Sequence, residues 1–156
     1  MSQRSVEHAT FALERTYDAS PGRVFAAWAD SEAKARWFDD SETEVVEHDF
    51  RVGGWERRRG KAPDGRAYSF QALYQDIVPS QRIVYTYDML VAETRISVSV
   101  ATVEFRPDGD RTRLVYTEQG ALLDGQEPPA RREQGMGSLL DALGRWLQSN
   151  RSDRHG

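Results

Sequence analysis

The sequence predicts an α+β fold in which a curved antiparallel sheet of about seven strands holds one long C-terminal helix. Through the middle of the chain, apolar and polar residues alternate in short runs separated by Gly, Pro and Asp, which is typical of strands joined by tight turns. Near the C-terminus, apolar residues instead recur at steps of three and four, which is the period of one helical face. Such a helix can bury its apolar stripe only against the sheet.

The N-terminal part predicts one strand followed by two short helices. The strand is expected at about residues 8–17. Ser20 and Pro21 are residue types that favour a helix N-cap and a first turn, and a second short helix is expected to begin at Asp30 or Ser31. Helices this short cannot form a layer of their own, so we expect them to close one end of the sheet.

Alternation assigns faces to the strands in the middle of the chain. His48 and Phe50 share the apolar face of the second strand. In the sixth strand, Val98 and Val100 belong to the apolar face, and the parity then switches before Val103. A one-residue switch of this kind predicts a bulge or a sharp bend between these positions.

A last strand at about residues 113–118 precedes the long helix, which is expected over residues 129–149. Gly135 and Gly137 lie in the first half of this helix, where each costs about 1 kcal/mol relative to Ala. They indicate either a close backbone approach or an incompletely filled space. The apolar stripe of the helix consists of Met136, Leu139, Leu140, Leu143 and Leu147. Together these elements predict the helix-grip arrangement.

Composition limits the class of protein. A chain of 156 residues suits a single domain, here residues 1–156 with a core at about 8–148. The net charge of -4 argues against nucleic acid as a partner, and the absence of Cys excludes disulfides and thiolate chemistry. The first ten residues have no apolar segment of the signal-peptide type, and no apolar run approaches the ~20 residues of a membrane span. We therefore expect a cytoplasmic protein that does not contact the membrane.

Short motifs spread along the chain resemble one family. Residues 49–54 (DFRVGG) resemble its D-x-R-x-G-G turn, residues 17–21 (YDASP) its opening, and residues 102–105 (TVEF) its next-to-last strand. Over about residues 8–148, the chain resembles the activator of heat shock protein 90 ATPase homologue branch of the SRPBCC superfamily, which has the START and birch-pollen-allergen-like fold. Two departures border the expected cavity. Residues 37–40 read WFDD where the family usually has W-W-G-P, and the last helix has Gly135-Met136 or Gly137-Ser138 where the family usually has Gly-Trp.

The resemblance implies an apolar cavity between the sheet and the long helix. Members of the superfamily bind lipids, hormones or polyketides, some cyclise or dehydrate such compounds, and others are domains of chaperone activators. Fold alone does not choose among these functions. Three hypotheses follow for this chain: binding of a small hydrophobic ligand, a polyketide-cyclase/dehydratase-like enzyme acting in the same cavity, and a chaperone-interaction domain.

The candidate ligand-binding residues are mostly aromatic. Several tyrosines on one face are unusual for a dry core, because each buried hydroxyl needs a hydrogen-bond partner, and apolar walls with a few polar groups are typical of small-molecule pockets. The alternative is that these side chains are ordinary core residues. The candidates are Trp37, His48, Phe50, Trp55, Tyr68, Phe70, Tyr74, Tyr85, Tyr87, Val98, Val100, Tyr116, Met136 and Leu140.

Proton transfer has two candidate residues. His48 titrates near neutral pH, and Glu118 would act as an acid or base if it faces the cavity. The alternative for His48 is a core histidine whose ring nitrogens are hydrogen-bonded, and the alternative for Glu118 is a side chain in solvent at the end of a strand. The run Arg57 to Arg59 is interpreted as a solvated strand edge. No metal-binding or phosphate-binding motif is present, so no metal and no cofactor are expected.

Binding of a small hydrophobic molecule is the function we favour from the sequence. Tyrosine hydroxyls and His48 would orient the ligand. A chaperone interaction has no further support in the sequence, and the chain is expected to be a monomer or a homodimer.

Overall fold

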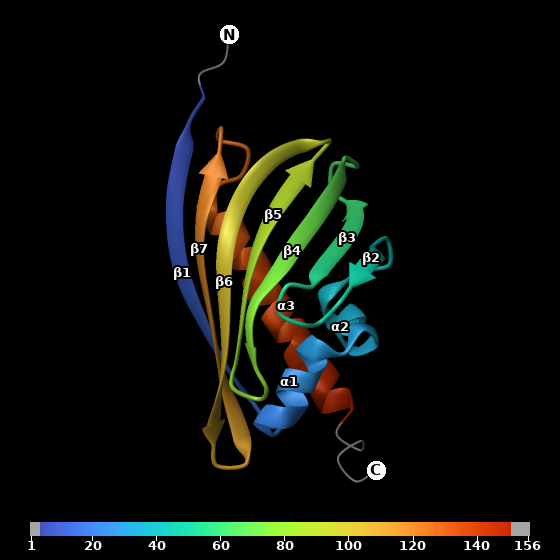
Figure 1. Cartoon of the computed structure of the whole chain (residues 1–156), viewed down its shortest axis with the longest axis vertical. Coiled ribbons are helices and arrows are strands. Elements are labelled where there is room, and N and C mark those ends of the chain that lie inside the picture. The colour runs from blue at the N-terminus through green and yellow to red at the C-terminus, as the bar shows by residue number, and fades with distance from the viewer. Residues whose placement is uncertain (1–3, 151–156) are drawn as a thin grey trace.

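The computed structural model describes residues 4–150 and shows a seven-stranded antiparallel sheet that curves around one long helix (Figure 1). The strand order is β1-β7-β6-β5-β4-β3-β2. Strands β2 to β7 each pair with the next strand in the sequence, and β1 pairs with β7. The strands are β1 (Val6–Tyr17), β2 (Glu44–His48), β3 (Trp55–Lys61), β4 (Ala67–Val78), β5 (Arg82–Val91), β6 (Thr94–Asp108) and β7 (Arg111–Leu123). The helices are α1 (Pro21–Ala29), α2 (Ser31–Phe38) and α3 (Pro129–Ser149). The predicted helix-grip fold is confirmed.

The three helices lie where their sequence patterns require. α3 crosses one face of the sheet, α2 lies beside β2, and α1 lies next to α2 at one end of the sheet, where it packs on β6 and β7 (Figure 1). Ser20 caps α1 by accepting a hydrogen bond from the backbone N–H of Arg23 at 3.3 Å, and Pro21 occupies the first turn. The stripe of α3 is buried through Met136, Leu140 and Leu143. The two short helices therefore close one end of the space between α3 and the sheet.

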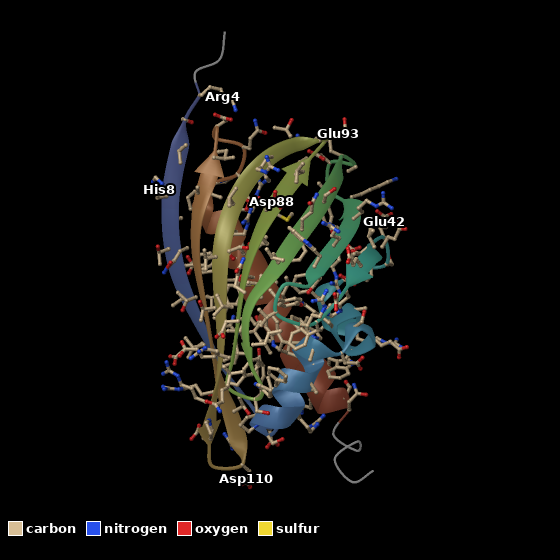
Figure 2. All side chains as sticks on the ribbon, viewed as in Figure 1. Arg4, His8, Glu42, Asp88, Glu93 and Asp110 are labelled. Carbon is tan, nitrogen blue, oxygen red and sulfur yellow. The ribbon has the colours of Figure 1, made fainter. Side chains whose placement is uncertain are left out.

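The strands alternate between an inner face that packs against α3 and an outer face that is exposed. On β4 and β5 the inner residues are large and aromatic, among them Phe70, Tyr74 and Tyr85. β6 runs the full length of the sheet, since the β5–β6 turn at Glu93 and the β6–β7 turn at Asp110 lie at opposite ends (Figure 2). α3 covers the inner face between these ends, and the core lies there.

The predicted parity switch in β6 is wrong. Between Val98 and Val103 the strand pairs with β5 without a change of register. The irregularity lies earlier, where Ile96 has no partner between the pairs Leu90–Arg95 and Met89–Ser97. As a result Ser97 faces inward, and Val98 and Val100 lie on the outer face, 46% and 38% exposed.

The two glycines in the first half of α3 have different surroundings. A Cβ atom on Gly137 would lie 3.3 Å from Nη2 of Arg15, which also hydrogen-bonds to the carbonyl of Gly137. A Cβ atom on Gly135 would have no other atom within 4 Å. The close approach at Gly137 is thus to the side chain of Arg15 and not to another backbone segment, whereas Gly135 is exposed and borders open space. Within residues 4–150, no helix is long and apolar enough to cross a membrane.

Candidate functional site

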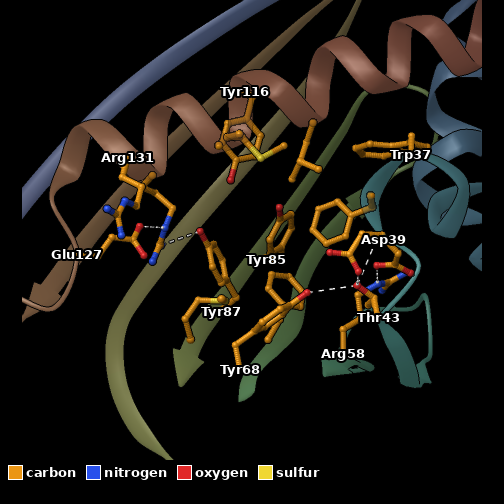
Figure 3. A pocket seen from close by; sticks show the side chains of 18 residues that line it. Trp37, Asp39, Thr43, Arg58, Tyr68, Tyr85, Tyr87, Tyr116, Glu127 and Arg131 are labelled. Carbon is orange, nitrogen blue, oxygen red and sulfur yellow. Dashed lines mark hydrogen bonds and ion pairs between the residues drawn. The ribbon is translucent and has the colours of Figure 1, made fainter. Parts of the chain in front are cut away.

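A cavity of about 460 Å³ lies between the first half of α3 and the inner face of β4 and β5 (Figure 3). Its sheet side is formed by Tyr68, Phe70, Tyr85, Tyr87, Met89 and Tyr116. Its helix side is formed by Arg131, Arg132, Gly135, Met136 and Leu139, with Glu127 just before the helix. The end nearest α2 is formed by Trp37, Phe38, Asp39, Asp40, Thr43 and Arg58. The volume lies within the ~300–1,000 Å³ that is common for ligand pockets.

Aromatic rings form most of the cavity wall and hold one another in place. Phe38 packs edge-on against Phe70 with ring centroids 5.5 Å apart, and Phe70 lies 5.0 Å from Tyr87. Trp37 is fixed by a hydrogen bond from its indole N–H to the carbonyl of Ala27 at 3.0 Å. The wall therefore combines packed aromatic rings with charged side chains at its two ends, Asp39, Asp40 and Arg58 near α2 and Glu127, Arg131 and Arg132 near the start of α3.

Beside the α2 end of the cavity lies a buried group of polar side chains, here called the β3 cluster: Lys34, Asp39, His48, Glu56, Arg58 and Tyr74. Glu56 is at its centre. Nζ of Lys34 lies 2.9 Å from Oε1 of Glu56, and both Arg58 and Tyr74 donate hydrogen bonds to the same carboxylate. Lys34, Glu56 and Arg58 are each only 1% exposed. Two basic and two acidic side chains are thus balanced inside the protein.

Burial and neighbouring charges together set the ionisation of the β3 cluster. Burial raises the pKa of the Glu56 carboxyl, but the Lys34 ammonium and the Arg58 guanidinium outweigh it and lower the pKa to about 2. Burial lowers the pKa of His48 to about 4, although Glu56 opposes this shift. His48 is therefore neutral near pH 7 and hydrogen-bonds to Tyr74, whose hydroxyl lies 3.3 Å from Nε2.

Three buried atoms of the β3 cluster have no hydrogen-bond partner among the described residues: Nδ1 of His48, Nη2 of Arg58 and Oδ2 of Asp39. Arg58 donates from Nε to Oδ1 of Asp39 at 2.7 Å and from Nη1 to Glu56. Its Nη2 is buried and has no acceptor, and Oδ2 of Asp39 is buried and has no donor. Buried polar atoms are seldom left without a partner, and these atoms are enclosed by the protein rather than exposed to the cavity.

At the other end of the cavity lies a second group, here called the α3 cluster: Tyr87, Ser97, Tyr116, Glu118, Glu127 and Arg132. The Glu118 carboxylate accepts hydrogen bonds from Tyr87 at 2.8 Å and from Tyr116 at 2.6 Å. Arg132, on the first turn of α3, donates to Glu118, Tyr87, Ser97 and Glu127. Each of its three nitrogens has an acceptor, and the cluster joins α3 to the sheet.

The tyrosines of the cavity are hydrogen-bonding groups and not bases. Burial raises the pKa of Tyr85 and of Tyr116 well above the usual value, and burial together with the charge of Glu118 raises the pKa of Tyr87. All three hydroxyls therefore keep their protons at neutral pH. They offer polar contacts to a bound molecule at little cost in charge.

The structure brings only part of the predicted set to the cavity. Trp37, Tyr68, Phe70, Tyr85, Tyr87, Tyr116 and Met136 line it. His48 and Tyr74 are instead in the β3 cluster, where Phe50 packs against Tyr74 with ring centroids 4.9 Å apart, and Leu140 is in the core. Trp55 lies on the outer face of β3, where Arg57 stacks on it, and Val98 and Val100 lie on the outer face of β6.

The two candidate proton-transfer residues belong to different clusters. His48 lies 3.6 Å from Glu56, whereas Glu118 is bonded to Tyr87, Tyr116 and Arg132. The carboxylate paired with His48 is therefore Glu56. Within residues 4–150, no group of three or more His, Asp or Glu side chains is placed to hold a metal ion.

The sequence identified His48 and Glu118, and Glu118 is buried and not at a solvated strand end, but the other charged residues of both clusters were missed. The interpretation of the run from Arg57 to Arg59 as a solvated edge is wrong for Arg58, because α2 and Asp39 cover its inner-face position. A usable signal was present: Glu56 and Arg58 are two residues apart on one strand, so they share a face that Trp55 and Arg57 do not. Nothing in the local sequence around Arg132 indicates its partners.

Comparisons with known proteins agree on one family. The family described as activator of Hsp90 ATPase homolog 1-like protein matches residues 18–148. The crystal structure of the Mll3558 protein from Rhizobium loti is 48% identical, covers 92% of this chain and 99% of that chain, and has a TM-score of 0.86. A protein from Rhizobium leguminosarum is 41% identical over 95% of this chain and 99% of that chain, with a TM-score of 0.87. The CV1439 protein from Chromobacterium violaceum is 28% identical over 87% and 95%, with a TM-score of 0.74. No curated protein matches.

Proposed function

The chain belongs to the activator of Hsp90 ATPase homolog 1-like family, and we propose that it binds a small, mainly hydrophobic molecule in the cavity between α3 and the sheet. The observation that carries the proposal is the open space below Gly135, where the wall of α3 has no side chain and a Cβ atom would have no neighbour within 4 Å. Gly135 is exposed and lines the cavity, so the absence of a side chain there leaves the space between α3 and the sheet open.

The lining explains how affinity would arise. Burying apolar ligand area against the aromatic wall yields about 25 cal/mol per Å² before the costs of ordering the ligand. Tyr85, Tyr87 and Tyr116 add no charge to the wall, and the hydroxyls of Tyr87 and Tyr116 already donate hydrogen bonds to Glu118. The cavity thus suits a molecule with an apolar body and few polar groups.

The variant Gly135→Trp tests the proposal by placing an indole in the cavity. We expect the wild-type protein to bind the neutral fluorescent probe N-phenyl-1-naphthylamine, and the variant to bind it at least tenfold more weakly. The variant should be no less stable than the wild type, because replacing Gly inside a helix favours the helical state by about 0.5–1 kcal/mol. Binding is followed by probe fluorescence and stability by thermal unfolding.

Ser138→Trp is the matched control, since Ser138 is exposed on the same helix and does not line the cavity. It adds the same side chain to α3 without filling the space, so it should bind the probe as the wild type does. The proposal is overturned if the wild type does not bind the probe, or if Gly135→Trp binds it unchanged.

A further inference from the structure

We propose that the free edge of β1 is an interaction surface for a second copy of this chain. The two β1 strands pair antiparallel with Phe11 opposite Phe11, so that two seven-stranded sheets join into one. Such a contact is isologous, because each copy contributes the same strand. It goes beyond the proposed function and is separate from it, since no residue of β1 lines the cavity.

The two edge strands of the sheet differ in how they are protected against further pairing. β2 has only five residues, its pairing with β3 shifts register between Val45 and Glu47, and α2 lies beside it (Figure 1). β1 has twelve residues, contains no proline and no lysine, and pairs with β7 from Val6 to Tyr17 without a shift. Short length, bulges, proline and lysine are the devices that keep an edge from pairing, and β1 has none of them.

The outer side of β1 is open. β1 ends the strand order of the sheet, and within residues 4–150 its only strand partner is β7. Figure 1 shows no helix along this side of the strand. The outward N–H and C=O groups of β1 are therefore available to another strand, as they are along any uncovered sheet edge.

Charged side chains decide which strand fits this edge. In the proposed register, Glu7 lies opposite Arg15 of the second copy, and His8 lies opposite Glu14. Two-fold symmetry makes each of these contacts occur twice. Arg15 lies 2.7 Å from Asp141 within its own copy, so it would stand between two carboxylates. The charges that would oppose an unrelated strand are thus complementary to a second β1.

The same register aligns the apolar positions. Ala9, Phe11 and Leu13 alternate on the inner face of β1 and are only half-buried, although Phe11 packs on Tyr116 of β7 with ring centroids 6.2 Å apart. In the pair, Phe11 meets Phe11 and Ala9 meets Leu13, so each copy covers the open side of the other. Cross-strand pairs of this kind stabilise antiparallel strands.

Other registers lose this match. A shift by two residues moves the centre of the pair to position 10 or 12, where Glu7 faces Leu13 or Arg15 faces Ala9, and no opposite charges meet within the strand. A shift by one residue places inner positions opposite outer ones. The register centred on Phe11 is therefore the one that joins opposite charges and apolar residues together.

Sedimentation velocity of the wild-type protein at rising concentration tests the interface. We expect a reversible change from 17.8 kDa to twice that mass. The series extends to ~1 mM, so that even a contact with a millimolar Kd is seen. A protein that stays at 17.8 kDa throughout overturns the second copy as the partner.

A charge exchange tests the register. His8→Glu places two carboxylates opposite each other, and Glu14→Lys removes the carboxylate that faces His8, so each should weaken dimerisation about tenfold. The double variant His8→Glu/Glu14→Lys restores opposite charges and should return the dissociation constant to within about threefold of the wild type. Residues 8 and 14 are ~20 Å apart along one extended strand, so recovery arises only between copies.

Gln75→Glu is the matched control, since exposed Gln75 lies on β4, four strands from β1, and gains one negative charge as His8→Glu does. It should dimerise as the wild type does. Dimerisation that is unchanged in both single variants, or that is not recovered in the double variant, overturns the proposal. Binding of N-phenyl-1-naphthylamine should be the same in all these variants, so this proposal and the cavity proposal stand or fall separately.

Discussion

The β3 cluster and the α3 cluster are both buried groups of charged and hydroxyl side chains at the two ends of one cavity, yet they differ in how completely they are bonded. In the α3 cluster, the Arg132 guanidinium and the Glu118 carboxylate have partners at every nitrogen and oxygen. In the β3 cluster, Arg58 and Asp39 each have one buried atom without a partner in the protein. A fully bonded network stabilises one structure, whereas each enclosed polar atom without a partner reduces the stability that its network contributes.

The two clusters also differ in how far their charged side chains are exposed to solvent. The side chain of Arg132 is 12% exposed and lies on the first turn of α3, so its contacts join the helix to the sheet near solvent. The side chains of Lys34, Glu56 and Arg58 are almost completely enclosed between α2 and β3. Removing one charged partner should therefore lower the free energy of unfolding more in the β3 cluster, because water cannot reach the opposite charge that is left unpaired.

The largest expected effect is on stability, and it compares Glu56→Gln with Glu118→Gln. Loss of the Glu56 charge leaves Lys34 and Arg58 buried beside a neutral amide, so unfolding should become easier by about 3–5 kcal/mol. Loss of the Glu118 charge should cost about 1–3 kcal/mol, because Arg132 keeps Glu127 and the Tyr87 and Tyr116 hydroxyls can turn to accept from the new amide.

Urea unfolding of both variants measures this difference. Glu47→Gln is the exposed control, since Glu47 pairs with Arg57 on the outer face and should change the free energy of unfolding by less than about 1 kcal/mol. An equal cost for Glu56→Gln and Glu118→Gln would show that the two clusters do not differ as described.

A smaller effect concerns pH and isolates His48. Because the pKa of His48 is lowered to about 4 in the folded state from 6.5, the unfolded chain binds the proton first as the pH falls. Stability from this residue is complete above pH 6.5 and is lost progressively toward pH 4, by up to about 3 kcal/mol at ~1.4 kcal/mol per pKa unit. The lowered pKa of Glu56 acts in a separate window, from 4.5 down to about 2.

The measurement is the free energy of unfolding of wild type and His48→Gln between pH 7 and pH 4. The wild type should lose up to about 3 kcal/mol more than His48→Gln over this range. His8→Gln is the control, because His8 is exposed at the outer edge of the sheet on β1 and should retain the wild-type slope (Figure 2). Parallel slopes for wild type and His48→Gln would contradict the burial of a neutral imidazole in the β3 cluster.

Local sequence patterns predicted the fold because each element carries its own signal. The helical period of α3, the cap at Ser20 and the alternation in β4 and β5 are all readable within a few residues. The aromatic part of the cavity wall followed from the same alternation, as the inward positions of Phe70 and Tyr85 show.

The polar part of the site could not be predicted in this way, because it depends on partners far apart in the chain. Arg58 is buried only because Asp39 and Glu56 meet it from α2 and from its own strand. Val98 and Val100 were assigned to the wrong face because the register irregularity at Ile96, which turns Ser97 inward, arises from pairing with β5. The partner of His48 is set in the same way, by the pairing of β2 with β3 that places it opposite Glu56.

The most direct test of the central claim is an NMR titration of protein labelled at the methionine methyl groups. Apart from Met1, the methionines are Met89 and Met136, and both line the cavity. Addition of N-phenyl-1-naphthylamine should shift both methyl signals in the wild type and in Ser138→Trp, and should shift neither in Gly135→Trp. Unmoved signals in the wild type at saturating probe, or equal shifts in Gly135→Trp, would contradict binding in the space between α3 and the sheet.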